Sequence, residues 1–245
     1  MAQNEAVSLV ERVSKMYYVL SATDIKNFSA WVTSNVFVEK TKNLTEEKIY
    51  PLEIIWYTPD KLYFIQRPIN TEDDSVYQIL AKYQQSLQKE LKAILLDWKR
   101  FCVTPMLSDL PPDYQFTDRG DTVIFSFERV EQNDSIDVDI FLGKNGSCLK
   151  IISYDRRIDQ RILTYPSYKY SGNKWVCAGW LVQIQEGEEI TNAYTVKVVN
   201  KTIENVLLPD TFVMQLQTKR ESGQIFRREY RFRNIRVNRD LKIVE

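Results

Sequence analysis

The segment EIIWYTPDKLYFIQRP, residues 53–68, contains two runs of consecutive apolar residues on either side of a Pro-Asp turn. The first run extends from Ile54 to Tyr57 and the second from Leu62 to Ile65. Because side chains alternate between the two faces of a strand, each run places apolar groups on both faces of the predicted hairpin. A hairpin with one solvated face would alternate apolar and polar residues instead. The sequence therefore predicts a hairpin that meets the core on one face and a helix, partner or ligand on the other.

Two other segments have the periodicity of amphipathic helices. Residues 6–20 place apolar side chains at helical spacing, and residues 72–103 continue this pattern over a much longer stretch. Thr71 can cap the longer helix. Residues 27–40 alternate as a strand does, directly before the hairpin. We therefore expect helices near 6–20 and 72–103, with strands between them.

The second half of the chain is a series of short apolar stretches separated by polar turns such as GKNGS at 143 and YSGNK at 170. Regular spacing of this kind is typical of an antiparallel meander, with about ten strands in total over residues 27–68 and 113–239. The sequence has no Gly/Ser-rich linker and no repeat of fixed period. We therefore expect a single domain over residues 1–245.

Several of these strands have one apolar and one polar face. Val123, Phe125 and Phe127 share a face by the period of two, as do Ile140 and Leu142 in the next strand. A sheet with one dry, concave side is complementary to amphipathic helices. The predicted fold class is α+β, mainly β: an antiparallel, strongly curved, unclosed β-barrel of about ten strands wrapped around two or three helices.

The composition argues against several classes of function. Histidine is absent, which removes the commonest general base and metal ligand. The sequence has no glycine-rich phosphate loop and no GxSxG nucleophile elbow, and Asp137 and Asp139 have no third metal ligand in the pattern. The 33 basic and 33 acidic residues create no net field that would attract nucleic acid. We predict no catalysis, no cofactor, no metal and no nucleic-acid partner, with a serine- and carboxylate-dependent hydrolase as a minor alternative.

The three cysteines, Cys102, Cys148 and Cys177, lack the spacing of a zinc site. Ordinary buried thiols are the favoured interpretation. The alternative is one disulfide bond, for which Cys148 and Cys177 are the pair most plausibly on neighbouring strands.

The C-terminal segment RREYRFRNIRVNR, residues 227–239, interleaves arginine with aromatic residues. The period of two places Arg227, Arg231 and Arg233 on one face. Such a face can contact an anionic headgroup or single-stranded nucleic acid. Charged side chains also protect a terminal strand from edge-to-edge pairing, and this second interpretation is favoured.

The order of these segments resembles a known family. IKNFSAWVTSNVFVEK leads into the hairpin EIIWYTPDKLYFIQRP, and YSGNKWVCAGWLVQIQ is followed by TVKVVNKTIENVLLPDTFVMQLQ. This arrangement resembles the periplasmic lipoprotein-carrier (LolA-like) superfamily. The resemblance implies an unclosed β-barrel around a helical plug, whose interior holds lipid or the acyl chains of a lipoprotein.

The resemblance also implies a periplasmic or otherwise extracytoplasmic protein whose signal peptide has been removed. The first residues contain no basic region followed by an apolar stretch, so a cytoplasmic location is the alternative. No apolar run reaches the roughly 18 residues of a transmembrane segment.

Two functional hypotheses follow. The first is a non-catalytic carrier or binding protein for an acyl chain, a lipid or a lipoprotein. The second is a structural or interaction module of the cell envelope, with a filled core and a protein partner. Under the first hypothesis, the predicted lining residues of the cavity are Ile55, Tyr57, Leu62, Phe64, Phe125, Phe127, Ile140, Leu142 and Trp180.

Overall fold

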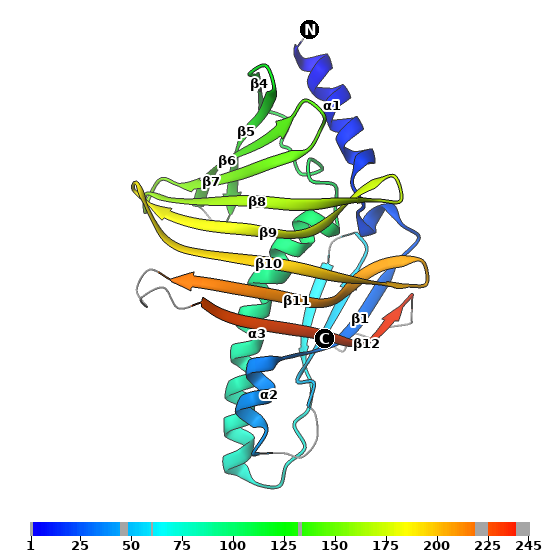
Figure 1. Ribbon diagram of the computed structural model, residues 1–245, viewed down its shortest axis with the longest axis vertical. Helices are drawn as coiled ribbons and strands as arrows, with labels where there is room; N and C mark the ends of the chain where they lie inside the picture. Colours follow the sequence, from blue (N-terminus) through cyan, green and yellow to red (C-terminus); the bar gives the residue numbers. More distant parts are fainter. Residues whose placement is uncertain (1, 45–48, 60, 132–133, 219–224, 239–245) are drawn as a thin grey trace. The chain divides into compact units, whose positions relative to one another are not determined.

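The computed structural model describes residues 2–44, 49–59, 61–131, 134–218 and 225–238. Figure 1 shows its helices and strands. The helices are α1 (Ala2–Met16), the short 3-10 helix η1 (Leu20–Ala22), α2 (Asn35–Thr41) and α3 (Asp74–Cys102). The strands are β1 (Asn27–Ser34), β2 (Leu52–Tyr57), β3 (Lys61–Gln66), β4 (Gln115–Asp118), β5 (Thr122–Glu131), β6 (Asp134–Gly143), β7 (Cys148–Asp155), β8 (Gln160–Ser171), β9 (Lys174–Glu186), β10 (Glu189–Ile203), β11 (Val206–Thr218) and β12 (Ile225–Val237).

The strands form a 12-stranded sheet in the order β3-β2-β1-β12-β11-β10-β9-β8-β7-β6-β5-β4. The sheet is mostly antiparallel, and β3 and β4 stand at the two ends of this order, so the sheet is unclosed. The predicted fold class, α+β and mainly β with an unclosed antiparallel sheet, is thus confirmed. Pairing of β1 with β12 brings distant parts of the chain together, since Phe28 lies opposite Val237.

Two strands were not predicted from the sequence, β4 and β8. β4 has only four residues, and β8 contains Pro166, which normally argues against an inner strand. Pro166 lies opposite Trp180, and the register of β8 shifts between Ser167 and Tyr168. The pairs of β8 with β7 end at Thr164, so Pro166 lies beyond them, where a residue without an N–H donor leaves no ladder hydrogen bond to β7 unmade.

Helix α2 corrects the prediction that residues 27–40 form one strand. β1 ends at Ser34, whose hydroxyl accepts a hydrogen bond from the Phe37 N–H and so caps α2. Helix α3 also begins later than predicted, because Asp73 rather than Thr71 is its N-cap. The Asp73 carboxylate accepts hydrogen bonds from the backbone N–H groups of Ser75 and Val76, which fixes the first turn.

The chain divides into two compact units. Unit 1 comprises Met1–Tyr18, Pro105–Lys197 and Met214–Arg227, and unit 2 comprises Val19–Thr104, Val198–Val213 and Arg228–Glu245. The expectation of a single domain over residues 1–245 stays a prediction.

The core of unit 2 lies between α3 and one face of the sheet. The ring of Trp98 on α3 contacts Phe28 on β1 at a centroid distance of 6.0 Å and Phe212 on β11 at 6.4 Å. Phe28 in turn packs on Trp56 of β2 at 5.8 Å. Helix α2 lies beside α3 (Figure 1). The Lys40 ammonium lies over the ring of Tyr83. These aromatic contacts join α3 to three strands of unit 2.

A buried amide fastens the hairpin to α3. Gln84 is only 3% exposed, and its Nε2 donates hydrogen bonds to the carbonyl oxygens of Pro51 (2.6 Å) and Arg67 (2.8 Å). These two carbonyls lie at the outer ends of β2 and β3. One side chain of α3 therefore holds both strands of the hairpin.

In unit 1, α1 packs on the turn between β6 and β7. The Tyr17 hydroxyl donates to the Gly146 carbonyl (2.9 Å) and accepts from the Cys148 N–H (2.8 Å). Gly146 has a φ of +85°, and a Cβ there would approach Met16 Sδ to 2.9 Å. Glycine is therefore favoured by the backbone conformation, and a larger residue would also displace the side chain of Met16.

The substitution Gln84→Met should lower the free energy of unfolding by about 1–3 kcal/mol, because it removes two hydrogen bonds from a buried amide to main-chain carbonyls while keeping the side-chain volume. Urea denaturation measures this change. The control is Gln85→Met, on the exposed side of the same helix turn, which should change stability by less than about 0.5 kcal/mol. Equal effects of the two substitutions would contradict the assigned role of Gln84.

Tyr17→Phe should also destabilise the protein by about 1–3 kcal/mol, since it leaves the Cys148 N–H and the Gly146 carbonyl without their buried partner. The matched control is Tyr170→Phe, at a side chain that is 63% exposed. If both variants unfold at the wild-type urea concentration, the hydroxyl of Tyr17 does not anchor α1.

Candidate functional site

Five of the predicted lining residues share one apolar face of the sheet in unit 1. Phe125 lies directly opposite Ile140, and cross-strand partners point to the same face. The same row continues through Ile151, Thr164 and Val182. The other three residues lie two positions along from members of this row and hence on the same face: Phe127, Leu142 and Trp180.

The burial of this face changes along the strands. Phe125, Leu142 and Trp180 are at most 2% exposed, and the ring of Phe125 contacts Tyr114 at 5.6 Å and Phe116 at 5.3 Å. This end of the face is therefore filled by side chains of unit 1.

The next row along the same strands is more open. It runs from Phe127 through Val138 and Ser153 to Ile162 and Ile184, each opposite the next. Phe127 and Ile184 are half-buried, and Ile162 is 37% exposed. We call Phe127, Ile162 and Ile184 the unit 1 row. These apolar side chains lie on the same face of the sheet as the core, but other side chains cover them only in part.

The four predicted lining residues of the hairpin belong to unit 2 and lie on two opposite faces. Leu62 is opposite Trp56 and Phe64 is opposite Ile54, so these two residues share the face that α3 covers. Ile55 and Tyr57 alternate with these residues and point to the other face. The hairpin residues therefore do not form one lining, and whether any of the nine predicted residues bind a ligand stays a prediction.

On the face that α3 covers, burial decreases toward the edge strand. Trp56 and Ile54 on β2 are 0% exposed, whereas Leu62 and Phe64 on β3 are half-buried. We call Leu62 and Phe64 the β3 margin. Like the unit 1 row, the β3 margin is a partly covered apolar surface.

The second face of the hairpin is covered in part by side chains of unit 2 itself. The Arg67 guanidinium lies 3.7 Å from the ring centroid of Trp31, and Tyr57 packs on Tyr63 at 6.2 Å. Ile55, between Ser29 and Tyr63 of the flanking strands, is 3% exposed. Arginine and tyrosine side chains thus provide the second cover that the sequence of the hairpin requires.

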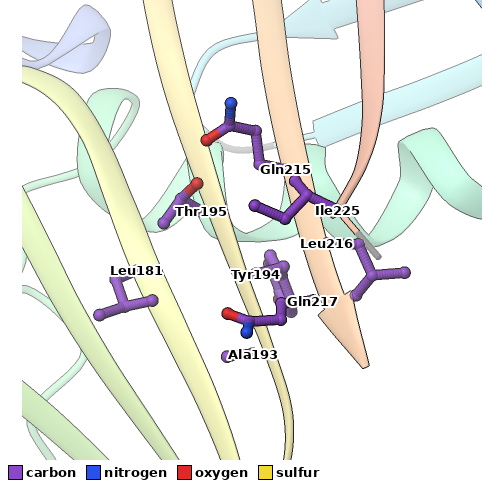
Figure 2. A pocket seen from close by; sticks show the side chains of 8 residues that line it. All are labelled: Leu181, Ala193, Tyr194, Thr195, Gln215, Leu216, Gln217 and Ile225. Atoms are coloured by element: carbon purple, nitrogen blue, oxygen red, sulfur yellow. The ribbon is translucent and has the colours of Figure 1, made fainter. Parts of the chain in front are cut away.

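A small pocket lies on the sheet of unit 1 (Figure 2). Its volume is about 120 Å³, below the roughly 300 Å³ at which ligand pockets begin. Four of its eight lining residues are aliphatic, and one of these, Ile225, is 65% exposed. This pocket is therefore too small for an acyl chain. The residues that line it are Leu181, Ala193, Tyr194, Thr195, Gln215, Leu216, Gln217 and Ile225.

Two of the arginines predicted to contact an anionic headgroup take part in ion pairs. The Arg231 Nε is 2.8 Å from Glu229, and an Arg233 nitrogen is 2.9 Å from Asp210. Arg227 is exposed and belongs to unit 1, whereas the other two belong to unit 2. Glu229 and Asp210 offset the positive charge of Arg231 and Arg233, to which an anionic headgroup would bind. Contact with a headgroup stays a prediction.

A polar cluster that the sequence did not indicate lies between α3 and β12. The carboxylate of Glu90 forms an ion pair with Arg228 and accepts a hydrogen bond of 3.2 Å from the hydroxyl of Tyr230, which is fully buried. Burial alone would lower the pKa of Arg228, but the hydrogen bond and ion pair with Glu90 raise it above the ordinary value. Glu90 and Arg228 are separated by more than half of the chain, so only the fold reveals their contact.

Other predicted features can be placed directly. Cys148 and Cys177 are buried thiols, as favoured above, and the alternative disulfide between them is not formed. The Asp137 carboxylate is 2.6 Å from the guanidinium of Arg156. Among the residues that the structure describes, no three His, Cys, Asp or Glu side chains are grouped to hold a metal ion. Within the same residues, no helix is both long and apolar enough to cross a bilayer.

The geometry thus defines an α+β protein with an unclosed antiparallel sheet and two partly covered apolar surfaces. No family model matches the sequence, and no match was found among curated proteins or solved structures. The resemblance to lipoprotein carriers stays a prediction.

The buried tyrosines make stability sensitive to alkaline pH. Burial raises the pKa of Tyr17 and of Tyr230, so both phenols stay protonated in the folded state. The unfolded chain releases these protons near pH 10. The stabilising contribution is therefore complete below about pH 10 and is lost as the pH rises toward the folded-state pKa.

We expect the urea midpoint to fall more steeply between pH 9 and 11 for the wild type than for Tyr230→Phe or Tyr17→Phe. Tyr170→Phe, at an exposed position, should keep the wild-type slope. The same slope in all four proteins would show that neither buried phenol controls the pH dependence.

Proposed function

We propose that the protein binds acyl chains of a lipid or lipoprotein without chemical conversion, as a carrier or binding protein in an extracytoplasmic, periplasmic compartment. One observation carries this proposal: in each unit, the apolar face of the sheet continues beyond the side chains that fill its core. The continuation is the unit 1 row in unit 1 and the β3 margin in unit 2. Half-buried apolar surface of this kind is a ready contact for a hydrocarbon chain.

The energy available from such contacts grows with the number of methylene groups that the surface covers. Each methylene group removed from water contributes about 0.8 kcal/mol, so five or six methylenes supply about 4–5 kcal/mol before the entropy of association is subtracted. A long acyl chain therefore needs a strip of several apolar side chains rather than a deep pocket. The unit 1 row meets this requirement together with the buried Val138, because four of the five strands along this line contribute an apolar side chain: Phe127, Val138, Ile162 and Ile184.

The second candidate function is an interaction module of the cell envelope. The edge strand β3 favours it, because β3 stands at the end of the sheet order and carries four half-buried apolar or aromatic residues in succession. An extended peptide can add to such an edge through main-chain hydrogen bonds. The two functions differ in their ligand, which is an acyl chain in the first and a peptide in the second, so a binding experiment separates them.

Ile162→Gln in unit 1 and Phe64→Gln in unit 2 should each weaken binding of a fluorescent fatty acid if the corresponding surface holds the chain. The expected loss is about tenfold, since each change removes about two methylene equivalents of contact. Fluorescence titration measures the affinity, and native mass spectrometry of the mildly purified protein detects a bound acyl species.

Matched controls are available for both surfaces. Ile158→Gln changes an isoleucine that is 59% exposed in the turn before β8, and Ile65→Gln changes the neighbour of Phe64 on the opposite face of β3. Both controls should bind as the wild type does. Absence of acyl binding by the wild type, together with binding of an extended peptide that protects the β3 amides from hydrogen exchange, would replace the carrier proposal with the interaction module.

A further inference from the structure

Trp56 is a buried hydrogen-bond donor without an acceptor. Its side chain is 0% exposed, and Nε1 finds no partner among the residues that the structure describes. A buried donor left unpaired costs the folded state about 1–3 kcal/mol. Phenylalanine would fill an aromatic site without this penalty. Phe28 does so on the neighbouring strand β1, with its ring centroid 5.8 Å from that of Trp56. The indole N–H therefore has no role in packing that explains its presence.

Trp56 is also next to the partly covered edge of its unit. It lies directly opposite Leu62, which is half-buried and belongs to the β3 margin. Neighbouring strands are about 4.8 Å apart, so the backbone of Trp56 lies one strand spacing from this margin. Phe64 continues the margin along β3 on the same face. A chain that lies along Leu62 and Phe64 would thus end beside the indole of Trp56.

We propose that the Trp56 indole N–H donates a hydrogen bond to the carbonyl oxygen of a fatty-acyl ester whose hydrocarbon chain lies on the β3 margin. The inference rests on the function proposed for that margin and specifies its ligand class. Indole nitrogen is a donor only, so the ligand must supply an acceptor. A neutral ester meets this need, whereas a carboxylate would lose its hydration beside the aromatic rings of Phe28 and Trp98.

The test compares two ligands of similar chain length, methyl palmitate and heptadecane, as competitors of a bound fluorescent acyl probe. The wild type should bind the ester about fivefold to tenfold more tightly than the hydrocarbon, which corresponds to one net hydrogen bond. Trp56→Phe should lose this preference and keep its affinity for heptadecane. Trp98→Phe, the same exchange within the same aromatic cluster, should retain the preference for the ester.

A second measurement does not depend on any variant. In the ¹H–¹⁵N spectrum of the wild-type protein, the indole resonance of Trp56 should move downfield on addition of methyl palmitate and stay in place with heptadecane. This measurement decides the question if Trp56→Phe does not fold, because an indole resonance that the ester leaves unchanged overturns the proposed hydrogen bond.

The outcomes separate the two proposals. If neither ligand binds the wild type, the proposed acyl-binding function itself fails. If both ligands bind the wild type with equal affinity, or Trp56→Phe weakens both by the same factor, acyl binding stands and the hydrogen bond from Trp56 is overturned.

Discussion

The aromatic contact of Trp98 with Phe28, and of Phe28 with Trp56, is the interaction on which unit 2 depends. It joins a helix to two neighbouring strands through rings whose centroids lie about 6 Å apart. Aromatic side chains bury about 150–250 Å² each, so these rings make a large apolar contact between the helix and the sheet. The polar contacts of α3, from Gln84 and Glu90, lie on either side of buried apolar residues of the helix. Hydrophobic burial thus brings the helix to the sheet, and hydrogen bonds set its position along the strands.

Most of the architecture was predictable because it follows from local periodicity. Helical spacing over residues 72–103 and alternation in strands such as β5 and β6 depend only on which neighbours are apolar. The errors arose where a single contact overrides the pattern. Ser34 caps a helix inside an apparently strand-like segment, and β8 contains Pro166 at a point beyond its last pair with β7, at Thr164. Such contacts involve backbone groups whose geometry the pattern of side chains does not describe.

The candidate site was predictable only in part, for a related reason. In unit 1 the period of two assigned Phe125, Phe127, Ile140 and Leu142 to one face, and the observed register places them there. In the hairpin both faces are apolar, so composition could not identify the face that α3 covers. The register determines which residues share a face, because pairing of Tyr57 with Lys61 across the turn puts Trp56 opposite Leu62. Trp56 was missed since a tryptophan in an apolar run is normally only a packing residue.

The difference between apolar packing and recognition is sharpest at Trp56. Contacts such as those of the unit 1 row accept any hydrocarbon, because dispersion and the hydrophobic effect have no direction. A hydrogen bond has direction, and a donor held in a dry site strongly disfavours a ligand that leaves it unpaired. Leu62 and Phe64 would supply most of the affinity for an acyl chain, while the single N–H of Trp56 would determine which end of the chain is accepted. Selectivity at the β3 margin would then reside in a buried polar group that folding leaves unsatisfied, the indole N–H of Trp56.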